Sequence, residues 1–505
     1  MPGHPDTRHR PPARRVRGPR TDLPRRTAYD VLAAVADRGA YANLLLPKLL
    51  AERSLTGRDA ALATELAYGT LRGLGTYDAV LAACSDRPLD KLDPPVLHVL
   101  RMGAHQLLAT RVGAHAAVAT SVDLAKAVAG PRVSGYVNAV LRRVSTRDLD
   151  QWLAIVAPAQ ESDPDGYLAV RYSYPRWIIG AYRDALGEAA GSELAAALAA
   201  GDERPRVTMA VYPGGPGRDE VMPQGAEPTR WSPYGFTLPG GDPSPLIATG
   251  LAAVQDQGSQ LAAIALAKAP LAKAPLAKAP NGGVAGETEA LAGAPAVRAR
   301  DGERWLDMCA GPGGKARLLR GLAGTAGARL VASDVHPHRA ALIQGAFASH
   351  GTAGTASAVL AADGRCPAWR AAAFDRVLVD VPCSGLGALR RRPEARWRKS
   401  ESDLPALAEL QRALLRSAFK ACRPGGVVAY VTCSPVQAET RDVVNAVLSD
   451  TPDVEVLDAP AVLSDVPGLR SQDPRFAQLW PHRHGTDAIF IALLRRVNRG
   501  RVEYD

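Results

Sequence analysis

The feature that most constrains the fold is an alternation of short apolar runs with longer helical patterns, which begins at residue 304. Each run is almost continuously apolar, which is typical of a strand covered on both faces of a sheet. Helical periodicity fills the gaps between the runs. This alternation predicts an α/β domain with a mostly parallel sheet. The expected strands are Arg304–Met308, Arg329–Ser333, Arg376–Val381, Gly426–Thr432 and Ala488–Leu494, and the expected helices span about 314–323, 338–349, 404–422 and 437–449.

The N-terminal quarter of the chain carries a different pattern. Apolar residues recur there at steps of three and four, and Pro94-Pro95 ends one helix and starts another. These features predict an all-helical domain over residues 27–147. Residues 148–250 are expected to form a linker and a small α/β module with a strand near Val207–Tyr212, ahead of the main α/β domain at 251–500.

Two segments are expected to remain without regular structure. Residues 1–26 contain eight arginines and six prolines with few apolar side chains, so burial cannot offset the entropy lost on ordering. They predict a disordered basic tail, which is either an electrostatic arm for RNA or a dispensable end. Leu-Ala-Lys-Ala-Pro occurs three times in tandem from residue 266, and proline at every fifth position forbids a continuous helix. We therefore expect a flexible low-complexity insert over 262–300.

Composition narrows the class of protein. The 505 residues are 47% hydrophobic, so the chain is not wholly disordered, and six cysteines are too few for a disulfide-stapled secreted scaffold. No apolar run reaches the roughly 20 residues of a transmembrane helix. We expect a cytoplasmic protein without a membrane partner, and nothing in the sequence indicates more than a monomer. The net charge of +10 points to an acidic partner, most commonly nucleic acid.

A glycine-rich segment at the first strand–helix junction predicts a cofactor site. Asp307–Lys315 reads Asp-Met-Cys-Ala-Gly-Pro-Gly-Gly-Lys, and such glycines let a ligand approach the backbone beside a helix N-terminus. It is not a phosphate-binding P-loop, because residue 316 is Ala where Ser or Thr is required. Gly311 and Gly313 loosely match a dinucleotide fingerprint, and Asp334 ends the next strand, placed to bind a ribose. The site should therefore take an adenosine-type ligand.

Three more candidates follow later strands. Asp363 follows the third, where it could pair with an adenine amino group or simply form a turn. Cys383 and Cys433 follow the fourth and fifth, so both should face the crevice at the carboxyl ends of the strands. They could form a redox pair, bind metal or serve nucleophilic catalysis. No Cys-x-x-Cys or histidine cluster lies near them, so no metal site is predicted.

Together these motifs resemble the RsmB family, also called Sun or Fmu, of rRNA cytosine-C5 methyltransferases. The helical N-terminal domain, with its Asn138–Arg143 segment, is similar to NusB. The other segments that carry the resemblance are Asp307–Lys315, Asp380–Gly385, Thr432-Cys433-Ser434, Gln255–Gln260, Arg390–Trp397 and the last strand, Asp487–Ala492.

The resemblance implies a Rossmann-like class I methyltransferase domain that uses S-adenosylmethionine to make 5-methylcytosine in small-subunit (16S) ribosomal RNA. It implies that Cys433 is the nucleophile that adds to the cytosine ring, that Cys383 assists product release, and that Asp380 positions the base. A base within folded RNA would have to be flipped out to reach them. The implied cofactor-binding residues are Cys309, Ala310, Gly311, Pro312, Gly313, Gly314, Lys315, Asp334, Asp363 and Asp380, and the implied RNA-binding residues are Arg390, Arg391, Arg392 and Arg396.

Other functions stay open at this point. A nucleotide-dependent dehydrogenase would use the glycines and Asp334 but leave both cysteines unexplained, and a non-catalytic RNA-binding factor would use only the NusB-like half. The target could also be another rRNA site or a tRNA, because Val207–Tyr212 lacks the Arg and Asn often seen in the RNA-binding module of the family. Six basic side chains stand against Glu394 within residues 389–399. We expect that run to lie along an RNA backbone.

Overall fold

The computed structural model describes residues 22–272, 302–348 and 356–497. Contacts divide the chain into two units, Met1–Pro158 and Ala159–Asp505. The boundary falls after α8, a helix that lies within the range expected to be a linker.

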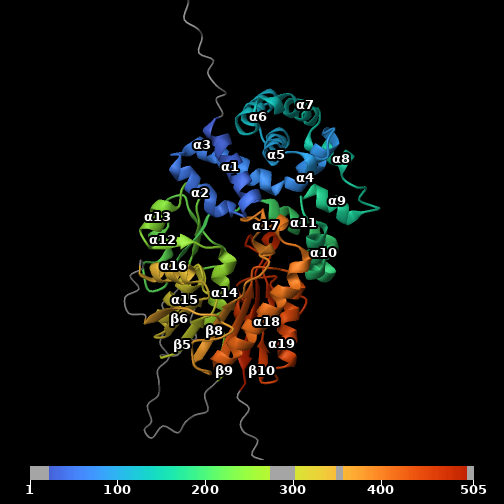
Figure 1. Ribbon diagram of the computed structural model, residues 1–505. Helices are drawn as coiled ribbons and strands as arrows, with labels where there is room; N and C mark the ends of the chain where they lie inside the picture. The colour runs from blue at the N-terminus through green and yellow to red at the C-terminus, as the bar shows by residue number, and fades with distance from the viewer. Residues whose placement is uncertain (1–21, 273–301, 349–355, 498–505) are drawn as a thin grey trace, which may run out of the picture. The chain divides into compact units, whose positions relative to one another are not determined.

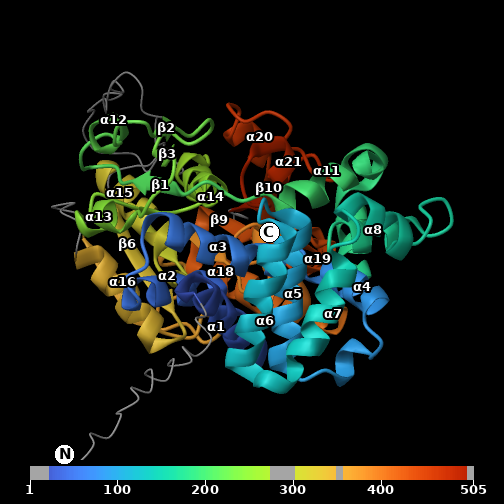
Figure 2. The ribbon, with the colours of Figure 1, turned by 90° about the horizontal axis from the view of Figure 1, so that it is seen from above.

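Unit 1 is helical throughout its described part, and the apolar faces of its helices share one core. Leu66, Leu100 and Leu141 come from three different helices and are all fully buried, as the steps of three and four predict. Helices α5, α6 and α7 lie side by side (Figure 2). The helices are α1 (Leu23–Arg38), α2 (Ala42–Glu52), α3 (Gly57–Arg72), α4 (Leu74–Cys84), α5 (Pro94–Ala109), α6 (Ala114–Ala129), α7 (Ser134–Val144) and α8 (Leu149–Val156).

Helix α1 begins inside the segment that was expected to be a disordered tail. The Asp22 side chain caps it by accepting a hydrogen bond from the Arg25 N–H over 2.9 Å. The Arg25 guanidinium is itself buried and donates to Gln106 Oε1 over 2.8 Å. The expectation is therefore wrong for residues 22–26, because Asp22 and Gln106 bind Arg25, and its remainder, residues 1–21, lies outside the described residues.

Unit 2 opens with three helices and a small sheet. In that sheet β3 pairs with β2 and β1, and β1 with β4, all antiparallel. The strand expected near Val207–Tyr212 is β1. The helices are α9 (Pro164–Arg171), α10 (Arg176–Leu186) and α11 (Ala190–Asp202), and the strands are β1 (Thr208–Val211), β2 (Glu227–Pro228), β3 (Gly235–Thr237) and β4 (Ala252–Val254).

The main sheet of unit 2 has the strand order β10-β12-β9-β8-β5-β6-β7, with β11 paired to β12. The neighbouring strands β9, β8, β5, β6 and β7 pair in parallel. Strand β12 pairs antiparallel with β9, β10 and β11. The expected α/β fold is thus confirmed. The strands are β5 (Arg304–Asp307), β6 (Arg329–Asp334), β7 (Ser357–Ala361), β8 (Phe374–Asp380), β9 (Cys422–Thr432), β10 (Val454–Leu457), β11 (Ala477–Gln478) and β12 (Phe490–Arg496).

Helices cover both faces of this sheet (Figure 1). One face packs on α14 (Gln257–Lys268), α15 (Gly314–Thr325) and α16 (Pro337–Ala348), and the other packs on α18 (Leu404–Ala421) and α19 (Arg441–Ser449). Strand β9 contributes side chains to the cores on both faces of the sheet, because successive side chains of a strand point to opposite faces. Its residues Val427, Ala429 and Val431 join the first core, and Val428 and Tyr430 join the second.

Helix α14 corrects the expected extent of the low-complexity insert. Every residue from Gln260 to Ala267 is buried, because α14 packs on the main sheet and also against α15 and β1. The helix ends at Lys268, just before the first proline of the repeats. The expectation of a loop from residue 262 is therefore wrong up to Lys268, and residues 273–300 lie outside the described part of the chain. Among the described residues, no helix has both the length and the apolar character needed to cross a bilayer.

Candidate active site

The expected site residues gather at one edge of the main sheet. Asp307 and Asp334 end β5 and β6, Asp380 ends β8, and β9 ends immediately before Cys433. Because these strands are parallel, the loops that follow them leave the same edge. Asp363 follows β7 at the margin of that edge. This is the edge at which open α/β sheets bind ligands.

The loop after β5 folds back onto the end of β6. The Gly311 N–H donates to Asp334 Oδ2 over 3.1 Å. Arg339 donates to the Gly311 carbonyl and lies 3.4 Å from the Asp334 carboxylate. A Cβ on residue 311 would stand 2.2 Å from Asp334 Oδ2, so this approach requires glycine. Gly313 has a φ of 112°, and α15 begins directly after it. Loop backbone and helix N-terminus together form a cradle that can hold a polar ligand.

A buried ion pair lies beside this cradle. Lys315 Nζ is 2.8 Å from Asp380 Oδ2. Burial favours the neutral amine, but the Asp380 carboxylate outweighs burial and raises the pKa of Lys315. The nearby Cys433 acts in the same direction. Both charges of the pair act on Cys433, the cysteine expected to be the nucleophile: Asp380 raises the pKa of its thiol and Lys315 lowers it.

Asp307 is a buried carboxyl group without a hydrogen-bond partner. It is fully buried, and neither side-chain oxygen meets a donor in good geometry. Burial and then the neighbouring Asp380 raise the pKa of Asp307 to about 8. Leaving such a group unsatisfied is costly, so its position beside the glycine cradle suits a cationic group of a ligand.

We expect Asp307→Asn to stabilise the protein without ligand. An unfolded aspartate loses its proton near pH 4, whereas Asp307 holds it to about pH 8. Between these pH values the folded state binds more protons, so this group's contribution to stability falls as pH rises. The variant should be more stable at pH 8, by up to about 5 kcal/mol, and unchanged near pH 4. Urea unfolding at both pH values measures this, and equal stability at pH 8 would refute the raised pKa.

The two cysteines at the ends of β8 and β9 touch. Cys383 Sγ lies 3.3 Å from Cys433 Sγ. The hydrogen bond from Cys383 lowers the pKa of Cys433 despite burial, and the cations Lys315 and Arg392 add to this effect. The same hydrogen bond, followed by burial, raises the pKa of Cys383. Within the pair, Cys433 is therefore the thiol that ionises, and Cys383 keeps its proton.

Asp363 and Cys309, two other expected site residues, are less available to a ligand than the residues above. Asp363 is bound by its own neighbour, because Arg365 donates to both of its carboxylate oxygens. Those hydrogen bonds lower the pKa of Asp363. Cys309 lies in the cradle, and burial raises the pKa of its thiol well above the usual range. Cys309 can therefore contribute backbone and bulk to the site, but its thiol stays protonated.

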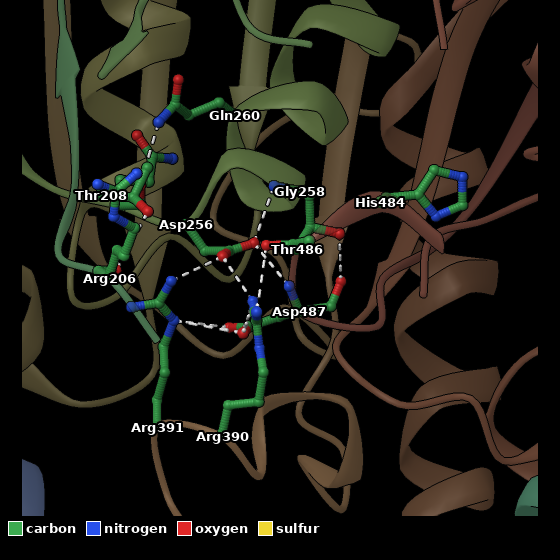
Figure 3. A network of polar contacts seen from close by, with 12 residues as sticks. Arg206, Thr208, Asp256, Gly258, Gln260, Arg390, Arg391, His484, Thr486 and Asp487 are labelled. Carbon is green, nitrogen blue, oxygen red and sulfur yellow. Dashed lines mark hydrogen bonds and ion pairs between the residues drawn. The ribbon is translucent and has the colours of Figure 1, made fainter. Parts of the chain in front are cut away.

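Two of the arginines expected to contact RNA form ion pairs within the protein (Figure 3). Arg390 and Arg391 point at the carboxylates of Asp256 and Asp487. Arg391 lies 2.8 Å from Asp256 and 3.2 Å from Asp487, and Arg390 lies 3.2 Å from Asp487. The Asp487 N–H also donates to Asp256, which caps α14. Both arginines are thus paired with carboxylates, and their contact with RNA stays a prediction.

Arg396 is also an internal residue. Its side chain is 0% exposed, lies 2.8 Å from Asp202 and donates to the Ser173 carbonyl over 3.0 Å. Its guanidinium carbon stands 4.0 Å from the centre of the Tyr174 ring. A fully buried guanidinium cannot reach a phosphate, so the RNA-binding role expected for Arg396 is wrong. Arg392, the remaining one of the four arginines, lowers the pKa of the catalytic candidate Cys433.

We expect Arg396→Ala to destabilise the protein by about 3 kcal/mol, because it removes one partner of a buried ion pair and a cation–π contact. Asp202 is 27% exposed, so water can recover part of the loss. Chemical unfolding of the variant measures the effect. Arg398→Ala is a matched control in the same basic run, since Arg398 is not among the buried residues. An Arg396 variant as stable as the control would contradict the internal role.

Sequence reasoning overlooked two residues of the site. Asp307 is the first residue of the glycine-rich segment Asp307–Lys315. Its position at the end of a strand, just before that loop, could have indicated a role in the site. Arg339 had no signal, because it reaches Asp334 and Gly311 only through the fold of α16.

Comparison with known proteins agrees with this arrangement. The sequence model described as 16S rRNA methyltransferase RsmB/F matches residues 294–495, and the NusB family model matches residues 22–146. The chain is 47% identical to the putative methyltransferase Rv1407 of Mycobacterium tuberculosis, over 96% of this chain and 99% of that protein. It is 31% identical to ribosomal RNA small subunit methyltransferase B of Pseudomonas putida, over 95% and 99% respectively. The crystal structure of PH0851 shares the fold, with a TM-score of 0.71 at 21% identity over 93% of this chain and 97% of that one.

Proposed function

Because the chain belongs to the RsmB/F family of 16S rRNA methyltransferases and carries a NusB domain, we propose that it methylates carbon 5 of a cytosine in 16S rRNA. The family establishes a methyltransferase that uses S-adenosylmethionine to modify RNA. The cytosine target rests on one observation above the others. Two thiols lie 3.3 Å apart at the sheet edge that carries the cofactor cradle, and the lower pKa belongs to Cys433.

The chemistry explains why a thiolate is needed. Carbon 5 of cytosine is a poor nucleophile, but addition of the Cys433 thiolate to carbon 6 breaks the ring double bond and moves electron density onto carbon 5. Negative charge then develops on the polar edge of the base. Lys315, held by Asp380 at 2.8 Å, can stabilise that charge while Asp380 orients the ring.

Product release reverses the addition. After carbon 5 has gained its methyl group, it must lose its proton so that the electron pair can reform the ring double bond and expel the Cys433 thiolate. Cys383 is in contact with Cys433 and keeps its own proton, so it is suited to hydrogen bond the departing sulfur, while the carbon 5 proton passes to water.

The cradle suits S-adenosylmethionine, which supplies the methyl group when bound. The loop Cys309–Lys315 offers backbone groups and a helix N-terminus, and Asp334 and Asp363 would face the nucleoside part. The unsatisfied Asp307 carboxyl would accept the cationic amine of the methionine part. This requirement for a cation is the feature that favours S-adenosylmethionine over a nicotinamide dinucleotide at the same cradle.

The RNA would be held by residues other than the internal arginines. We propose that Arg392 faces the strand near the target base, since its charge acts on Cys433. The NusB domain is a second RNA-contacting surface, and a cytoplasmic monomer is the form we expect to act.

A direct test is to incubate the purified protein with 16S rRNA and S-adenosylmethionine carrying a labelled methyl group, then to locate 5-methylcytosine by bisulfite sequencing. One modified 16S cytosine, also missing from the rRNA of a strain that lacks the gene, is the expected result. Methylation of a tRNA or 23S rRNA alone would refute 16S rRNA as the target but would leave the proposed carbon 5 chemistry intact. Methylation at another atom would overturn the proposal.

A further inference from the structure

A buried carboxylate joins the two cysteine loops. Glu439 is 0% exposed and lies in the short turn before α19. Its Oε1 accepts hydrogen bonds from the Ser384 N–H over 2.7 Å and from Gln411 Nε2 over 3.1 Å. Its Oε2 accepts from the hydroxyls of Ser384 over 2.5 Å and Ser434 over 2.7 Å. Four donors on one carboxylate offset the cost of burying it, and no cation is among these four.

The two serines place this carboxylate directly behind the reacting thiols. Ser384 follows Cys383 in the chain, and Ser434 follows Cys433. The serine hydroxyls lie 3.2 Å apart, much like the 3.3 Å between the two sulfurs. Glu439 thus binds the residue after each cysteine, and through them it joins loops whose sequence positions are 50 residues apart.

Neighbouring side chains hold Glu439 and the first loop in place. Gln411, on α18, donates to the Pro382 carbonyl over 2.9 Å as well as to Glu439. Tyr430, on β9, donates from its hydroxyl to the Glu439 backbone carbonyl over 2.7 Å. The carboxylate is therefore fixed relative to both β9 and α18, so the loops it binds are fixed relative to each other.

We propose that Glu439 is a positioning residue that keeps the Cys383 thiol in donating contact with Cys433. It touches neither sulfur and acts through Ser384 and Ser434. The inference rests on the proposed two-cysteine chemistry for its catalytic meaning, but its physical content is the spacing of two thiols. If the hydrogen bonds from Ser384 and Ser434 to Glu439 are lost, the two loops separate and Cys433 loses its hydrogen-bond donor. A smaller fraction of Cys433 is then thiolate at neutral pH.

The test measures the reactivity of Cys433 in the full-length chain, without RNA or cofactor. Iodoacetamide alkylation is followed between pH 6 and 10 by mass spectrometry of the peptide that contains Cys433. Glu439→Ala should slow alkylation at pH 7 by about tenfold, the change that one unit in the pKa of Cys433 produces. Glu439→Gln keeps one oxygen acceptor and the same shape, so it should restore the rate to within about threefold of the native protein.

The same substitution in a Cys383→Ala background tests whether Glu439 acts on Cys433 through Cys383. In Cys383→Ala the donor is already gone, so adding Glu439→Ala should change the alkylation rate less than twofold, which is a non-additive result. Should Glu439→Ala not fold, the double variant Ser384→Ala/Ser434→Ala removes both hydroxyl contacts and leaves the carboxylate two donors. It should shift the profile in the same direction by at least about threefold.

Glu303→Gln is the matched control. Glu303 is another buried carboxylate, bound to Arg376 over 2.8 Å, and it precedes β5 at the opposite edge of the sheet. This control should lower stability and leave the Cys433 profile unchanged. An unchanged profile in folded Glu439→Ala or in the double serine variant, or an undiminished effect in Cys383→Ala, would overturn the inference. Because alkylation needs no RNA, failure of the rRNA proposal would leave this result standing, and the reverse also holds.

Discussion

Cys433→Ala should abolish methylation, with a loss of at least about 10⁴-fold, and should remove every covalent enzyme–RNA complex. Without the thiolate, carbon 5 of cytosine receives no electron density and the remaining side chains cannot substitute. The cradle formed by Gly311, Gly313 and α15 is untouched, so the affinity for S-adenosylmethionine should stay within about twofold of the native value. Labelled-methyl transfer and denaturing gel electrophoresis with RNA containing 5-fluorocytosine, which traps the adduct, measure the two effects.

Cys366→Ala is the control for this variant. Cys366 is a free and exposed cysteine that follows Asp363, and its loss should leave both measurements unchanged. A Cys433 variant that retained a tenth of the native rate would overturn Cys433 as the nucleophile and would leave Cys383 as the other candidate.

Cys383→Ala should have the opposite effect on the adduct. Loss of the hydrogen bond to Cys433 should raise the pKa of that thiol, which slows addition about tenfold at neutral pH. Loss of the hydrogen bond to the departing sulfur should slow release by about 10²–10⁴-fold. Release is slowed more than addition, so the adduct accumulates while turnover falls by two orders of magnitude or more.

Single-turnover experiments with unmodified RNA distinguish these steps. The variant should give a persistent protein–RNA band without 5-fluorocytosine, whereas the native enzyme should give none. Absence of that band together with turnover reduced only about tenfold would show that Cys383 serves only to tune Cys433, and near-native turnover would contradict both roles. The double variant Cys383→Ala/Cys433→Ala should form no band, which tests that Cys433 is the attached residue.

The sheet was predictable because each of its main strands is a short, almost continuously apolar run in the sequence. Strand β9 is apolar at every position from Val427 to Val431, and the structure buries those side chains alternately in two cores. The glycine cradle was equally visible, because an approach as close as that of Gly311 to Asp334 excludes any side chain. In both cases the signal lies within a few consecutive residues.

The remaining features depend on partners distant in sequence. Arg390, Arg391 and Arg396 form a basic run, and their carboxylate partners come from residues 202, 256 and 487. Local charge counting cannot detect such pairing, because it registers the arginines without their partners. Helix α14 was assigned to the insert because the alanine-rich helix continues into repeats of similar composition, and only its burial separates them.

The network of Arg390, Arg391, Asp256 and Asp487 also bears on the thermodynamics of RNA association. A cation already neutralised by a carboxylate displaces no condensed counterions when a polyanion arrives. The slope of log affinity against log salt should therefore report fewer phosphate contacts than the six basic side chains of residues 389–399 suggest. Part of the positive charge in this run instead ties the start of α14 and the segment before β12 to the loop that follows Cys383.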